Sequence, residues 1–123
     1  RACIQVVDDE VGSPTWTVDL ARAMREIIDL SVSGPLYHLA GGGAASRYDL
    51  AKELFSMMGI RDCRIEPVSA DNFPLSARRP ADSSLASEHL EREGITPMRP
   101  WREALQDFVD QYLKEEMAGR MVR

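Results

Sequence analysis

Long apolar runs and an excess of positive charge are both missing from this sequence of 123 residues. No stretch approaches the roughly 20 consecutive apolar residues of a membrane-spanning helix, and the start carries no secretory signal pattern. Fifteen Lys and Arg against 20 Asp and Glu give a net charge of -5, whereas binding to nucleic acid phosphates favours a basic surface. We therefore expect a cytoplasmic protein that contacts neither a membrane nor nucleic acid.

Cysteine and histidine are scarce, with two of each. Cys3 and Cys63 form no C-x-x-C motif and no Cys/His spacing of a zinc site, which predicts two buried, reduced thiols. Neither His38 nor His89 has the partners of a catalytic triad or a metal site, so a structural role is expected for each. The acidic run at residues 8–10 lacks a second acidic cluster at a matching spacing, so a solvated strand end is favoured over a metal site.

What is present is an ordinary globular composition, with 44% hydrophobic and 28% charged residues. A chain of this length buries roughly two-thirds of its unfolded surface as one domain, and a second full domain would not fit. Strand and helix patterns alternate, which predicts an α/β fold with a largely parallel sheet. About three short strands and four helices are expected. The strands are Cys3–Val7, Leu36–Ala40 and Cys63–Val68, and the helices span residues 17–30, 46–58, 87–93 and 100–113.

The first predicted helix carries an apolar stripe at the 3.6-residue period of a half-buried helix. Thr17 or Asp19 is expected to cap its free N–H groups. Arg22 and Glu26 are expected to pair on the wet side, and Gly34-Pro35 is predicted to end the helix. The stripe consists of Leu20, Met24, Ile27 and Ile28.

The later elements carry clearer signals. Ser46 and Asp49 have the spacing of a capping box before the second helix, and Gly59 is predicted to end that helix. The prolines and polar residues of the 69–84 segment fit no regular element, so a loop is expected there. Pro100 opens the last helix, which has an unbroken apolar stripe. That stripe consists of Trp101, Ala104, Leu105, Phe108, Val109, Tyr112 and Leu113.

A glycine run, Gly41–Gly43, follows the apolar segment Leu36–Ala40, which is typical of a parallel strand covered on both faces. A strand, a glycine loop and a helix N-terminus is the arrangement that holds phosphate. However, G-x-G-x-x-G would need Gly or Ala at Ser46, and the nearest acidic candidate, Asp71, lies too far along the chain. We favour a tight turn before a capped helix and keep a small nucleotide-binding domain as an open alternative.

Tyr48 and Lys52 have the Tyr-x-x-x-Lys spacing of the catalytic pair in short-chain dehydrogenases, which places both on one helix face. Tyr48, however, begins its helix and lies on the apolar stripe. Leu36 stands where such enzymes carry an upstream Ser or Thr. We interpret the spacing as coincidence and Tyr48 as a core residue.

Arg78 and Arg79 stand together in the proline-bounded loop of an acidic chain, with Asp82 three residues after Arg79. Arginine suits bidentate contacts with phosphate, and a nearby carboxylate can accept hydrogen bonds from sugar hydroxyls. A surface ion pair is the alternative interpretation. The loop is therefore a candidate site for a phosphorylated sugar ligand.

Four segments, in the same order and at similar spacing, resemble the dTDP-4-dehydrorhamnose reductases. These are extended short-chain dehydrogenase/reductases that make dTDP-L-rhamnose. The chain departs from that family's usual residues at Glu10, Ala86 and His89, where Gln, Asp and Lys are common. The four segments are VVDDEVGSPTWTVDLARAM, LYHLAGGGAASRYDLAKELF, FPLSARRPADSSL and RPWREALQDFVDQYL.

The resemblance implies that residues 1–123 form a single C-terminal substrate-binding domain with a partial Rossmann-like sheet. In that family a preceding NAD(P)-binding Rossmann part carries the G-x-x-G-x-x-G loop and the catalytic Tyr-x-x-x-Lys pair. The expected activity of the whole enzyme is reduction of a 4-keto sugar on dTDP by NADPH or NADH. This chain alone is expected to bind no cofactor or metal, to hold no catalytic residue and to catalyse nothing.

The resemblance also implies a set of substrate-binding residues. Related reductases use an Arg-x-x-Asp in this region to contact the nucleotide diphosphate and ribose, and Arg79 and Asp82 match that spacing. Arg78 is the fallback, and Trp16 after the Gly-Ser-Pro-Thr turn is a further candidate. The expected partners are a dTDP-sugar, the Rossmann domain and, because a lone lobe leaves strand edges uncovered, a second copy of the chain. A stand-alone nucleotide-sugar-binding or protein-interaction module is the alternative function.

Overall fold

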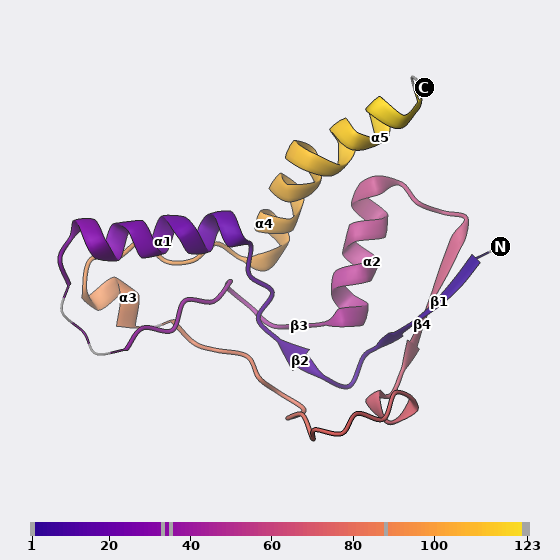
Figure 1. Cartoon of the computed structure of the whole chain (residues 1–123), viewed down its shortest axis with the longest axis horizontal. Helices are drawn as coiled ribbons and strands as arrows, with labels where there is room; N and C mark the ends of the chain where they lie inside the picture. The colour runs from indigo at the N-terminus through magenta and orange to yellow at the C-terminus, as the bar shows by residue number, and fades with distance from the viewer. Residues whose placement is uncertain (1, 33, 35, 88, 122–123) are drawn as a thin grey trace.

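The computed structural model describes residues 2–32, 34, 36–87 and 89–121. Two small sheets and a set of helices form an α/β arrangement (Figure 1). The strands β1 (Ala2–Val7) and β4 (Cys63–Val68) pair in parallel, with Ala2 opposite Cys63 and Val7 opposite Val68. Two shorter strands, β2 (Val11–Gly12) and β3 (Ala45–Ser46), pair antiparallel. The predicted strands Cys3–Val7 and Cys63–Val68 are therefore confirmed.

The third predicted strand, Leu36–Ala40, is wrong. This segment forms no strand, and Leu36 is 70% exposed. Two backbone N–H groups here donate to side chains and not to a neighbouring strand. The His38 N–H donates to Nε2 of His89 at 3.3 Å, and the Gly41 N–H, directly after the segment, donates to Oγ1 of Thr15 at 2.9 Å. Backbone groups that find partners in this way do not need a neighbouring strand.

Helix α1 (Thr17–Asp29) lies at one end of the molecule beside the short helix α3 (His89–Arg92) (Figure 1). Its buried face is made by Asp19 and Ala23, whereas Met24 and Ile28 of the predicted stripe are 52% and 70% exposed. Ile27 of the stripe packs against the core and Leu20 is half-buried, so the predicted apolar face is confirmed only in part. The buried carboxylate of Asp19 has a charged partner inside the protein, Arg99, as a buried charge requires.

The ends of α1 also differ from the prediction. Trp16 is the N-cap and makes no side-chain cap hydrogen bond, so neither Thr17 nor Asp19 caps the helix. The helix ends at Asp29, before Gly34, and Pro35 lies outside the described residues. The predicted pair of Arg22 with Glu26 is absent: Arg22 binds Asp19, and Glu26 accepts hydrogen bonds from the backbone N–H and the hydroxyl of Thr96.

The hydrophobic core lies between α1, α3 and the segment that leads into the last helix. Leu90, Ile95 and Met98 pack with Ala23, and Leu90 is fully buried. The last helix is one rod made of α4 (Trp101–Phe108), a π-helical segment η2 (Val109–Leu113) and α5 (Lys114–Met121) (Figure 1). Trp101, Ala104 and Val109 of its predicted stripe are buried, but Tyr112 is 47% exposed.

Helix α2 (Arg47–Met58) follows β3 and stands beside β1 and β4 (Figure 1). The predicted capping box is confirmed, since Oγ of Ser46 accepts from the Asp49 N–H and Oδ2 of Asp49 accepts from the Ser46 N–H. Gly59 closes the helix with φ 68°. The segment 69–84, predicted as a loop, contains one turn of 3-10 helix, Ala70–Asn72, and a single β-bridge from Asp82 to Val11, and is otherwise irregular.

The thiols are free but not buried, which corrects the prediction. Cys3 is exposed and Cys63 is half-buried. In the described part of the chain β1 pairs only with β4, so most of its side chains, including that of Cys3, face solvent. Within the described ranges no three His, Cys, Asp or Glu side chains are placed to hold a metal ion, and no described helix is long and apolar enough to cross a membrane.

Ser46→Ala should lower the free energy of unfolding by about 1–2 kcal/mol, which is the upper part of the range for loss of a helix N-cap. The expected cost is high because Ser46 is buried and its hydroxyl also donates to Oδ1 of Asp8 at 2.7 Å. Urea unfolding would measure the change. Ser56→Ala, at an exposed position of the same helix, is the control, and an equal effect of both substitutions would contradict the prediction.

Candidate functional site

A hollow of about 850 Å³ lies between the end of β1 and the loop that follows β4. The predicted arginines Arg78 and Arg79 both line it, together with Phe73 of the same loop. The end of β1 contributes Asp9 and Glu10, and Arg47 enters from the first turn of α2. The structure therefore brings the two arginines that the sequence singled out to one concave surface.

A second hollow, of about 310 Å³, lies beside the first. Its wall is formed by the turn at residues 12–14, by β3 and by Ser83. Glu10, Arg47 and Arg79 line both hollows. These three residues thus lie where the two hollows adjoin, and this place is called the divide below.

The three arginines of the hollow are available to a ligand. None of the ion pairs between described residues includes Arg47, Arg78 or Arg79. The carboxylate of Asp9, which also lines the hollow, accepts hydrogen bonds from the Ser69 hydroxyl at 2.6 Å and from the Ala70 N–H at 2.8 Å. These two hydrogen bonds lower the pKa of Asp9 and tie the start of the loop to the end of β1.

Asp82, the acidic member of the predicted Arg-x-x-Asp, lines neither hollow, although its neighbours Ala81 and Ser83 each line one. The hydroxyl and the N–H of Ser84 both donate to Oδ1 of Asp82, at 2.6 and 2.8 Å, and lower its pKa. Within the described residues Oδ2 receives no hydrogen bond and is open to a hydroxyl donor. The predicted contact of Asp82 with substrate stays a prediction.

Trp16 lies apart from the arginine loop and lines neither hollow. Its ring packs edge-to-face on Tyr112, with centroids 6.4 Å apart, and the guanidinium carbon of Arg99 lies 5.7 Å from the ring centroid. The geometry gives Trp16 a place between the start of α1 and the last helix. Its predicted role in substrate binding also stays a prediction.

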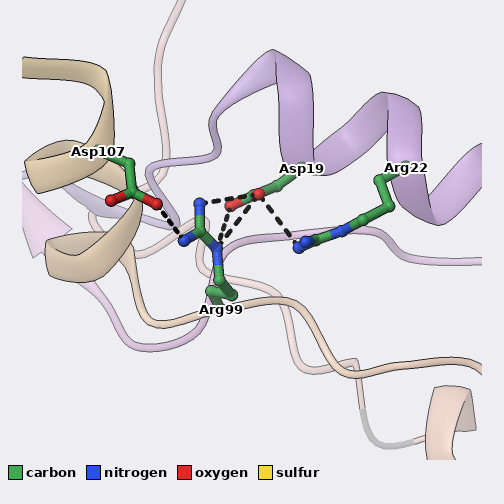
Figure 2. A network of polar contacts seen from close by, with 4 residues as sticks. All are labelled: Asp19, Arg22, Arg99 and Asp107. Carbon is green, nitrogen blue, oxygen red and sulfur yellow. Dashed lines mark hydrogen bonds and ion pairs between the residues drawn. The ribbon is translucent and has the colours of Figure 1, made fainter. Parts of the chain in front are cut away.

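A network of charges fixes these two helices against each other. Figure 2 shows Arg99 between Asp19 of α1 and Asp107 of α4, with Arg22 on the far side of Asp19. Nε and Nη2 of Arg99 donate to the Asp19 carboxylate at 3.0–3.2 Å, and the Asp19 side chain is only 4% exposed. The hydrogen bonds to Asp107 and Asp19 raise the pKa of Arg99 above its already high value.

The space beside the Gly41–Gly43 turn is occupied by other parts of this chain. A side chain at Gly41 would overlap the carbonyl oxygen of Pro14. The Gly42 N–H donates to the Arg99 carbonyl at 2.9 Å, and its carbonyl accepts from the Trp101 N–H at 3.0 Å. These groups do not fit a dinucleotide phosphate, because the Gly41 and Gly42 N–H groups that would bind it already donate to Thr15 and Arg99. Gly41 allows close packing on the Gly-Ser-Pro-Thr turn, whereas Gly42 and Gly43 lie against Pro100 and the Trp101 ring.

Tyr48 and Lys52 do meet on α2, with Nζ of Lys52 5.2 Å from the centroid of the Tyr48 ring. Tyr48 is half-buried, so the prediction that it is a core residue is confirmed only in part. Neither residue lines either hollow.

Comparison with known proteins gives a consistent set of relatives. The chain is 44% identical over 106 residues to a dTDP-4-dehydrorhamnose reductase of Mycolicibacterium smegmatis and 41% identical over 102 residues to one of Mycobacterium tuberculosis, matches that cover 86% and 83% of this chain. It covers 32% and 34% of those proteins, so it spans about a third of their length.

Solved structures show the same likeness. A Bacillus anthracis dTDP-4-dehydrorhamnose reductase in complex with NADP matches 90% of this chain with a TM-score of 0.83 and 33% identity. The corresponding reductase of Clostridium acetobutylicum matches 89% with a TM-score of 0.83 and 38% identity. This chain covers 39% of each of those chains.

The parallel pair of strands, with helix α2 packed beside it, and the likeness to the solved reductases define a class of protein, the substrate-binding lobe of an extended short-chain dehydrogenase/reductase. The model of one family, the RmlD substrate binding domain, matches residues 1–114. The chain belongs to that family.

The sequence analysis did not single out two arginines that the structure places in notable surroundings, Arg47 at both hollows and Arg99 between Asp19 and Asp107. Arg47 gave a signal, since a cation in the first turn of a helix opposes the helix dipole and is therefore unusual. Arg99 gave none, because its partner Asp19 lies far away in the sequence.

Proposed function

We propose that this chain is the dTDP-sugar-binding part of an NAD(P)H-dependent dTDP-4-dehydrorhamnose reductase, which reduces a 4-keto sugar in dTDP-L-rhamnose biosynthesis. The observation that carries the proposal is the pair Arg78 and Arg79, which line one hollow without an ion pair to a described carboxylate in a chain of net charge -5. Arginine binds phosphate oxygens bidentately. The family and the names of the relatives support the choice of ligand.

The cofactor and the catalytic groups are assigned to the part of the reductase that corresponds to the rest of the relatives' length. NADP is bound by the Bacillus anthracis relative, but the Gly41–Gly43 turn of this chain does not fit it. We therefore derive no hydride transfer from these residues and place the chain's contribution in holding the substrate. Association with a second copy of the chain, which the sequence predicts, stays a prediction.

Calorimetric titration tests the proposal. The 123-residue chain should bind dTDP in the arginine-lined hollow, and NADPH should give no comparable heat, because the Gly41–Gly43 turn does not fit a dinucleotide. A lack of response to dTDP would contradict the proposal and favour an interaction module. Tighter binding of NADPH than of dTDP would favour a nucleotide-binding domain instead.

Tyr48→Phe should leave the kcat of the complete reductase within about twofold of the wild-type value. The tyrosine is half-buried beside Lys52 and lines neither hollow, so loss of its hydroxyl should remove no contact with substrate. Steady-state turnover at saturating substrate measures the effect. A fall of several orders of magnitude in kcat, with the fold intact by circular dichroism, would show that Tyr48 and Lys52 form the catalytic pair.

A further inference from the structure

Arg47 occupies a position that helix stability does not explain. It is the first residue of α2, directly after the N-cap Ser46. A positive charge is unfavourable there, because the helix dipole already places partial positive charge at this end. The nearest acid of the first turn, Asp49, is used in the capping box and does not pair with Arg47.

The second observation is where the side chain of Arg47 lies. It lines both the larger and the smaller hollow, and Arg79 is the only other described cation that does so. The two arginines come from different elements, α2 and the loop after β4, and meet at the divide. Glu10 is the one carboxylate on this divide, so an anion held there meets two cations against one acid.

A ligand that extends from one hollow into the other passes the residues that line both, and two of these residues are arginines. A nucleoside diphosphate joined to a sugar has a neutral portion on each side of a doubly charged centre, which matches two hollows with a cationic divide. We propose that Arg47 is a third phosphate-binding residue and that Arg47 and Arg79 together hold the diphosphate at the divide. This inference rests on the proposed function and adds to it a residue that the Arg-x-x-Asp motif does not contain.

The test compares dTDP with thymidine, which lacks the diphosphate, in calorimetric titrations of the 123-residue chain. Arg47→Ala should weaken binding of dTDP about tenfold, the effect of losing one charge-assisted contact, and leave the binding of thymidine unchanged. Arg47→Lys should recover part of the loss, since a lysine keeps the charge but not the bidentate geometry. Arg61→Ala, at an exposed arginine that lines neither hollow, is the matched control and should bind dTDP like the wild type.

A thermal melt separates binding from folding. Arg47→Ala should melt at the wild-type temperature or above it, because the substitution removes a cation from the helix N-terminus. Wild-type binding of dTDP by Arg47→Ala would overturn this inference and leave the proposed function standing. An equal loss for thymidine and dTDP, or a lowered melting temperature with the loss, would assign Arg47 a structural role and overturn it as well. Failure of the wild-type chain to bind dTDP would instead overturn the proposed function.

Discussion

Arg79→Ala should raise the KM for the dTDP-sugar about tenfold to a hundredfold in the complete reductase, because a charge-assisted contact covered by ligand contributes about 1.5–3 kcal/mol. Arg79 lines both hollows and lies beside Arg78 without an ion pair to a described carboxylate. The KM for NADPH should not change, since the cofactor is assigned to another part of the enzyme. Steady-state kinetics with each substrate varied in turn would measure both constants.

Arg78→Ala should be made separately, because the two arginines are adjacent and either could make the dominant contact. Arg61→Ala serves here as well as a control for the loss of one positive charge. An unchanged KM for the dTDP-sugar in both Arg78→Ala and Arg79→Ala would show that neither arginine binds the substrate and that both are ordinary surface charges. The site assignment would then be wrong.

Arg99→Ala should lower the free energy of unfolding by about 3 kcal/mol, as expected when one partner of a buried ion pair is removed. The carboxylate of Asp19 would stay buried with only Arg22 beside it (Figure 2). The loss also removes the contact to Asp107 and the cation above the Trp16 ring. Urea unfolding monitored by tryptophan fluorescence is the measurement.

Two variants make this prediction specific. Arg22→Ala should cost less than about 1 kcal/mol, because Arg22 is largely exposed and surface pairs contribute little. Adding Asp19→Asn to Arg99→Ala should recover part of the stability, because a neutral amide is less costly to bury than an unpaired carboxylate. If Arg99→Ala and Arg22→Ala cost the same, the network is not what holds α1 against α4.

The parts of the fold that sequence could predict are those whose causes are local. The capping box at Ser46 and Asp49 and the left-handed turn at Gly59 were predicted correctly, because each involves residues only a few positions apart. The strands Cys3–Val7 and Cys63–Val68 were predicted from composition and flanking turns, and the structure confirms both.

The errors come from partners that are distant in sequence. Leu36–Ala40 has the composition of a buried strand, but His89 supplies a side-chain acceptor to it and no strand pairs with it. The apolar stripe of α1 points partly to solvent because Arg99 draws Asp19 into the interior. Nothing within either segment carries this information.

The candidate site shows the same division. Arg78 and Arg79 could be found from sequence because two adjacent arginines in a proline-bounded loop of an acidic chain are conspicuous. Their meeting with Arg47 depends on how the loop after β4 passes the start of α2, which the pattern of either segment does not determine.

The most direct test of the central claim is an NMR titration of the 123-residue chain with dTDP that follows the arginine Nε–Hε resonances. If the divide holds the diphosphate, the signals of Arg47 and Arg79 should shift together and saturate at one dissociation constant, while that of Arg61 stays in place. Saturable binding that moves neither Arg47 nor Arg79 would contradict the account.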